Sequence, residues 1–139
     1  MAVNNIPVFL ALPKSGHVQI LPADTSSLKT AYTGGTNGSK IIGIFGSSTD
    51  TSARDLQVGI TASAVTYPLG TKTIAITAGT VAGTPAVNML DPAVIVGMPV
   101  DNDGDPFIFL ASGETLDFHT LTTVTTAKAI SITVLAEDF

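Results

Sequence analysis

The stretch Ala129-Ile-Ser-Ile-Thr-Val-Leu135 alternates apolar and polar residues near the end of this 139-residue chain. Successive side chains of a β-strand point to opposite faces, so the two isoleucines and Val134 share one face while the serine and threonine share the other. This pattern predicts a strand with one face on a core and the other on solvent or on a partner.

A second stretch, Thr115–Thr120, repeats the alternation. Leu116 and Phe118 point to one side, and Asp117 and His119 point to the other. Leu121–Ala127, between the two stretches, is β-prone and uncharged, so it either extends a strand or forms a loop.

The rest of the chain is rich in Thr, Val and Ile, and Gly or Pro recurs about every ten residues, a spacing typical of an all-β sandwich or barrel. We expect one antiparallel, jelly-roll-like β-sandwich over residues 1–139, with little or no helix and with an extended N-terminal arm at residues 1–15. The other predicted strands are Val8–Leu12, His17–Leu21, Leu28–Thr33, Lys40–Phe45, Gln57–Ala62, Val65–Leu69, Thr71–Thr77, Val81–Met89, Ala93–Val96 and Pro106–Ala111.

Two hairpins are predicted among these strands. The Gly-rich turn at residues 34–39 is expected to join Leu28–Thr33 to Lys40–Phe45. The second hairpin is expected to pair Gln57–Ala62 with Val65–Leu69.

The segment Phe107-Ile-Phe-Leu110 does not alternate, which indicates a strand that is covered on both faces. The opposite sheet of a sandwich covers one face. A neighbouring subunit is a candidate for covering the other.

The composition points to the same need for a partner. Only 12% of residues are charged, against about 25% in typical domains, and the net charge is −5. The six basic residues are scattered singly, so no nucleic-acid partner is predicted. No apolar run has the length of a membrane span, and no basic residue precedes the apolar stretch Ile6–Leu12, so neither a membrane association nor secretion is expected.

An acidic turn, Asp101-Asn-Asp-Gly-Asp105, is the main candidate metal site in the sequence, ahead of a site built on His17 and His119 with a nearby acid. Asp101, Asp103 and Asp105 alternate as in the opening of a calcium loop. However, Pro106 stands where such a loop needs Gly, and Ser112 stands where it needs Glu. A hairpin turn with left-handed residues is favoured, with a calcium turn of another kind as the alternative.

No catalytic arrangement stands out, and the chain has no cysteine. It contains no Gly-x-Ser-x-Gly turn and only two histidines, too few for a three-histidine metal site. We therefore expect neither an enzyme nor a cofactor.

An ordered set of motifs resembles small structural proteins of tailed bacteriophages. It runs through Gln19–Thr25, Leu28–Ile41, Ala86–Leu90, Pro99–Leu116 and Val124–Val134, and ends in Glu137-Asp-Phe139. The resemblance implies a capsid decoration or cement protein, a family of small β-sandwiches or jelly rolls. It also implies the major capsid protein as partner, self-association as a homodimer or homotrimer, and a place on the capsid surface of the virion after assembly in the bacterial cytoplasm.

The expected contact surface combines the non-alternating strand, the N-terminal arm and the 121–126 segment. The candidate interface residues are Phe9, Tyr32, Phe107, Ile108, Phe109, Leu110, Thr123 and Val124. The alternative function is a tail or head-fibre adhesion module that binds a host-surface glycan, with calcium held by the acidic turn.

Overall fold

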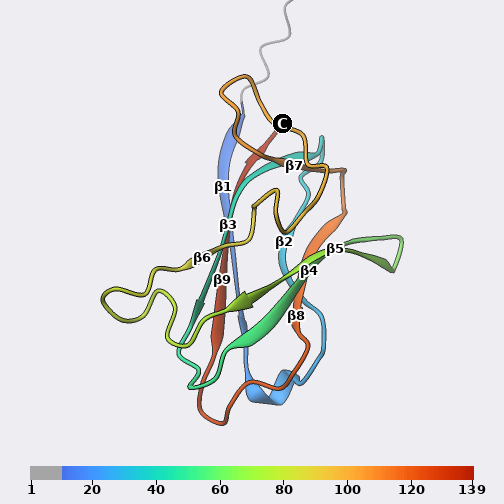
Figure 1. The fold of residues 1–139 in the computed structure, drawn as a ribbon. Helices are drawn as coiled ribbons and strands as arrows, with labels where there is room; N and C mark the ends of the chain where they lie inside the picture. Colours follow the sequence, from blue (N-terminus) through green and yellow to red (C-terminus); the bar gives the residue numbers. More distant parts are fainter. Residues whose placement is uncertain (1–10) are drawn as a thin grey trace, which may run out of the picture.

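The computed structural model describes residues 11–139 and shows two antiparallel sheets that face each other (Figure 1). One sheet has the order β1-β9-β3-β6, with β7 also pairing with β3, and the other has the order β2-β8-β4-β5. The strands are β1 (Leu12–Ile20), β2 (Lys29–Thr33), β3 (Ser39–Ser48), β4 (Arg54–Ala62), β5 (Val65–Ile74), β6 (Val87–Asn88), β7 (Ile108–Leu110), β8 (Thr115–Thr120) and β9 (Ile130–Asp138). The predicted all-β antiparallel sandwich is confirmed.

This strand order is that of a jelly roll, in which the chain crosses repeatedly between the two sheets, here of five and four strands. The short strands β6 and β7 together form one edge of the first sheet, each pairing with a different part of β3. Among residues 11–139, the helical structure is limited to a single 3₁₀ turn at Pro22–Asp24.

The core lies between the sheets and follows the alternation of the sequence. In β9, Ile130, Ile132 and Val134 are buried, and in β8, Leu116 and Phe118 are fully buried, as predicted. The other fully buried large side chains come from β1, β3, β4, β5, β7 and the loop after β6: Ile20, Ile41, Ile44, Leu56, Val58, Ile74, Met89 and Leu110.

The hairpin predicted at residues 34–39 is wrong. β2 pairs with β8 and β3 pairs with β9, so this segment crosses from one sheet to the other. A Cβ added at Gly34 would stand 2.3 Å from the carbonyl oxygen of Ala111. Gly34 and Gly35 therefore allow the chain to pass close to its neighbours where it crosses between the sheets, and they do not form a hairpin turn.

The strand predicted at Val8–Leu12 lies mostly outside the described residues, and the one predicted at His17–Leu21 starts earlier, since β1 runs from Leu12 through Pro13 to Ile20. β1 pairs with β9 from Leu12 to Ile20, so residues 12–15 belong to the sheet and not to an arm. An edge strand tolerates proline because one side of its backbone carries no ladder bonds. The rest of the predicted arm, with the interface candidate Phe9, lies outside the described residues.

The predicted pairing of Gln57–Ala62 with Val65–Leu69 is confirmed by β4 and β5, and β5 continues through Gly70 to Ile74. Their connection, Ser63-Ala64, has positive φ at both residues (50° and 64°), as a type I′ turn requires. This hairpin projects from the body of the domain (Figure 1).

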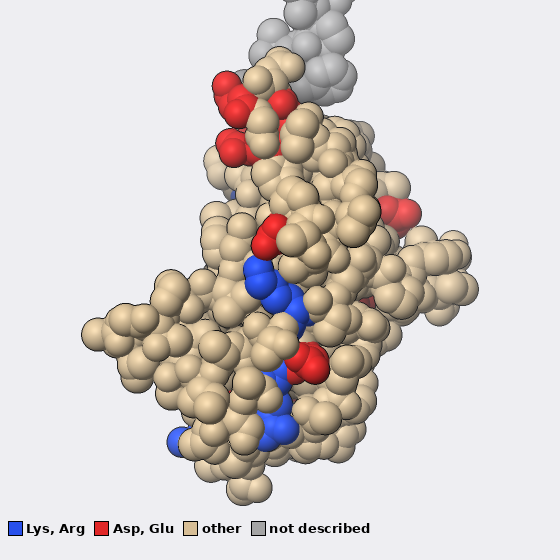
Figure 2. Space-filling model, in the orientation of Figure 1, with Lys and Arg blue, Asp and Glu red and all other residues tan. Residues whose placement is uncertain are grey.

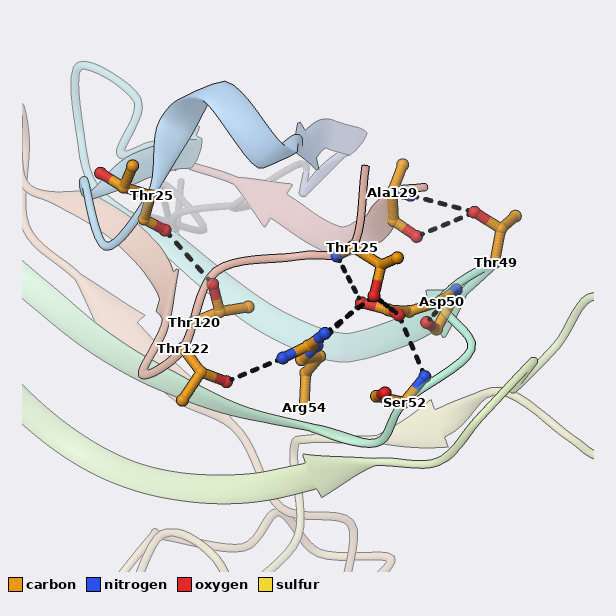
Figure 3. A network of polar contacts seen from close by, with 10 residues as sticks. Thr25, Thr49, Asp50, Ser52, Arg54, Thr120, Thr122, Thr125 and Ala129 are labelled. Carbon is orange, nitrogen blue, oxygen red and sulfur yellow. Dashed lines mark hydrogen bonds and ion pairs between the residues drawn. The ribbon is translucent and has the colours of Figure 1, made fainter. Parts of the chain in front are cut away.

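A buried ion pair between Asp50 and Arg54 lies at the end of the sandwich opposite β7 (Figure 3). The side chain of Asp50 is fully buried, and its carboxylate accepts hydrogen bonds from Arg54 Nε (2.8 Å), Thr125 Oγ1 (2.6 Å), Thr125 N (3.0 Å) and Ser52 N (3.0 Å). Burial raises the pKa of Asp50, but these donors outweigh it and hold the pKa well below its usual value. The network ties the β3–β4 loop to the segment between β8 and β9.

No helix in residues 11–139 has the length and apolar character that a membrane crossing needs.

Candidate interaction surface

The outer face of the β1-β9-β3 sheet carries a row of apolar side chains that residues 11–139 leave uncovered. Ile42 is 45% exposed, Phe45 39%, Leu135 39% and Phe109 58%. These four residues, from β3, β9 and β7, are called the apolar face below. Lys40, Asp101, Asp105 and Glu137 lie beside this patch, and Figure 2 shows acidic side chains gathered at one end of the molecule.

A bulge in β3 creates this surface. The register with β9 shifts between Ile41 and Gly43, which leaves Ile42 as an extra residue and turns its side chain outward. Gly43 lies under the neighbouring side chains: a Cβ there would be 3.0 Å from Phe45 Cε2 and 3.4 Å from Leu135 Cβ. The missing side chain lets Phe45 and Leu135 close over the strand.

An aromatic cluster continues the apolar face toward the C-terminus. The rings of Phe107 and Phe109 meet edge to face with centroids 4.9 Å apart, and Phe139 lies 6.3 Å from Phe109. Lys40 Nζ stands 4.8 Å above the centroid of Phe107 and 3.6 Å from a carboxylate oxygen of Asp101. One ammonium group is thus held between an aromatic ring and a carboxylate.

Next to this cluster is a hollow of about 460 Å³, called the β3 hollow below. It lies along β3 where β7 ends and β6 has not begun, two strands whose separation is visible in Figure 1. Its lining is polar and apolar in about equal parts, and three carboxylates contribute to it. The lining residues are Lys40, Ile42, Gly43, Phe45, Asn88, Leu90, Asp101, Asp105, Pro106, Phe107 and Glu137.

The far half of the same sheet face is polar. His17 Nδ1 lies 3.3 Å from Thr133 Oγ1, and Gln19 Nε2 donates to Ser131 Oγ at 3.1 Å. The apolar face is therefore a bounded patch and not a general property of the sheet.

The acidic turn forms part of the hollow's rim. Asp101 Oδ1 accepts from the backbone N–H groups of Asp103 and Asp105, both at 3.0 Å, and Gly104 has φ +89°. The N–H of Asp105 lowers the pKa of Asp101 most, the N–H of Asp103 and Lys40 add to this, and burial opposes it. Across residues 11–139, no group of three or more His, Cys, Asp or Glu side chains is arranged to hold a metal ion.

The structure divides the predicted interface residues into two groups. Phe107 and Phe109 lie on the outer surface, and Thr123 is exposed in its loop. The other described candidates are buried in the domain's own core: Tyr32 (8% exposed), Ile108 (7%), Leu110 (2%) and Val124 (2%).

The four buried residues therefore have to be withdrawn from the expected contact surface. Ile108 and Leu110 point inward because β7 alternates after all, and its second apolar face is the exposed one. Val124 fills the core from a loop, and the Tyr32 hydroxyl donates to Asp138 inside the domain.

Sequence reasoning missed the residues of β3 and β9 that complete the patch. The run Lys40–Phe45 is apolar on both faces, so the rule that was applied to Phe107–Leu110 also flags it. Leu135 carries a signal too, since it breaks the polar series of Ser131 and Thr133.

Comparison with known proteins gives little help. No family model matches the chain, and no curated protein matches it. Among solved structures, the chain is similar to one from a cyanophage Pam1 capsid asymmetric unit, with 14% identity over 92% of this chain and 84% of that chain and a TM-score of 0.46. Similarity at this level transfers no function from that protein to this one.

Proposed function

We propose that this chain is a virion structural protein that binds the outer surface of a phage capsid shell and reinforces it as a cement or decoration protein. The observation that carries the proposal is the apolar face, a bounded patch that the described residues of the domain leave exposed. The jelly-roll topology, which viral capsid domains commonly use, and the resemblance of the sequence motifs support it.

The size of the apolar face indicates how such binding would work. Fully burying one large apolar side chain contributes about 1.5–3 kcal/mol, and these four are roughly half exposed, so covering all four contributes roughly 3–6 kcal/mol. Association costs at least about 4 kcal/mol, so one face binds weakly by itself. A homodimer or homotrimer that places several faces on one shell gains affinity through avidity.

Co-sedimentation with purified capsid shells tests the proposal. We expect the wild-type protein to pellet with shells and to raise the temperature at which they break open. A variant with Ile42→Ser, Phe45→Ser and Leu135→Ser should bind at least about tenfold more weakly, the ratio that corresponds to 1.4 kcal/mol.

The matched control is Val65→Ser with Tyr67→Ser, which removes two equally exposed apolar side chains from the projecting hairpin. Circular dichroism establishes that each variant is folded. Equal binding by the wild type and the triple variant, or no binding by the wild type, contradicts the proposal.

The alternative role in glycan adhesion has weaker support. The carboxylate of Asp101 is already engaged by two backbone amides and lies beside Lys40. No role proposed here requires catalysis.

A further inference from the structure

We infer that the β3 hollow receives a cationic side chain, arginine or lysine, from a segment of the partner protein. The inference deepens the proposed function, on which the identification of that partner as a capsid protein rests. The recognition chemistry itself follows from the hollow and is testable without a capsid.

The lining of the hollow suits a long side chain with an apolar stem and a polar end. Ile42, Phe45 and the buried Leu90 supply apolar surface. Arginine and lysine bury their methylene stems on such surface while the charged group remains at a polar rim. A purely apolar side chain would fill the floor but would leave the rim carboxylates without a partner.

The rim supplies more negative charge than the domain itself neutralises. Asp101 is compensated by Lys40 at 3.6 Å. Within residues 11–139, no hydrogen bond or ion pair engages the carboxylates of Asp105 and Glu137, although both residues line the hollow. Two negative charges therefore face the hollow, which selects a cation and rejects an acidic segment.

Lys40 shows that this environment accepts a cation. Its ammonium group lies over the Phe107 ring and beside Asp101, with its side chain only 21% exposed. Because Lys40 occupies the Phe107 ring and Asp101, a partner's cation would use Asp105 and Glu137 together with the ring of Phe45, which also lines the hollow. Glu137 stands opposite Lys40 in the pairing of β3 with β9, and Glu137 and Asp105 are the rim carboxylates assigned to the incoming group.

A peptide titration followed by NMR tests the inference directly. The probes are acetyl-Leu-Arg-Leu-amide, its lysine analogue, and the citrulline analogue, which has nearly the shape of arginine but no charge. We expect the arginine and lysine peptides to shift the amide signals of Ile42, Phe45 and Glu137, with a dissociation constant on the order of 1 mM. The citrulline peptide should bind about tenfold more weakly, or not measurably.

Variants of the protein give the reciprocal test. Asp105→Asn combined with Glu137→Gln should weaken the arginine peptide about tenfold, because each exposed ion pair contributes modestly. Asp55→Asn, on the other sheet, is the matched control and should change nothing. Equal binding of the arginine and citrulline peptides, an unaffected double variant, or shifts confined to other surfaces overturns the inference.

The same double variant separates this inference from the proposed function. If it pellets with shells as well as the wild type does, the inference fails and the proposed function stands. If the peptide results hold but the wild type ignores shells, the proposed function fails and the cation site stands.

Discussion

Replacing Asp50 with asparagine is expected to destabilise the domain severely. The carboxylate is fully buried and accepts four hydrogen bonds, two on each oxygen. Asparagine has one acceptor oxygen, so its NH₂ group must face donors whichever way the amide is turned. The Arg54 guanidinium, with its side chain only 16% exposed, also loses its counter-charge.

The magnitude follows from the penalty for an uncompensated buried charge. Breaking a buried ion pair by removing one partner costs about 3–5 kcal/mol. Domains have about 5–15 kcal/mol of total stability, so the variant should lose roughly a fifth of it or more. The energies of the four hydrogen bonds cannot simply be added to this cost, because the bonds form one network and their contributions are not additive.

Equilibrium urea unfolding, followed by circular dichroism, measures the loss. Asp55→Asn is the control, since Asp55 is exposed and accepts one hydrogen bond, from Thr73 Oγ1 at 2.6 Å. We expect the control to change stability by less than about 0.5 kcal/mol. A similarly small change in Asp50→Asn would refute the assigned role of the network.

Three further outcomes are expected. Asp50 and Asp138 have folded-state pKa values below their ordinary values. The free energy of unfolding should therefore be constant above about pH 5 and fall as the pH drops below about 4. Unfolding measured across acid pH checks this, and the fall should be shallower in Asp50→Asn. Ser63→Asn with Ala64→Gly should raise stability by about 1 kcal/mol, because both positions have positive φ. A lower melting temperature in this variant would contradict the type I′ turn. Gly16→Ala should cost about 3 kcal/mol or prevent folding, since its Cβ would stand 2.0 Å from the Ala31 carbonyl oxygen; a melting temperature like that of the wild type would contradict that packing.

The strands with clean alternation were predictable from the sequence. β8 has the predicted bounds, and the inward residues of β9 are those expected, because a period of two in a half-buried strand is a local property. Residues 34–38 could not be assigned in this way. A Gly-rich turn fits a hairpin and a crossing equally well, and only the pairing of β2 with β8 decides between them.

The candidate surface was predictable in part for a similar reason. The non-alternating run Phe107–Leu110 correctly indicated that one face of the strand, with Phe109, stays uncovered within the domain. It did not show which residues of the run point inward. The bulge at Ile42 and the hollow between β6 and β7 depend on pairings between segments more than 40 residues apart, which no local pattern encodes.

The Asp50 network depends on the same kind of long-range contact. Asp50 and Arg54 are four residues apart, but the Thr125 groups that complete the site lie 75 residues from Asp50. The sequence shows an acid and a base in one loop, and only the fold shows that they are buried together.

The proposed function implies that a phage encodes this chain, and its most direct test is a density map of an intact particle of that phage. We expect jelly-roll domains on the outer surface of the shell, with Ile42, Phe45, Leu135 and Phe109 turned toward capsid subunits or toward neighbouring copies. Particles that lack the protein, or that carry it only in the tail, would contradict a role in decorating the capsid.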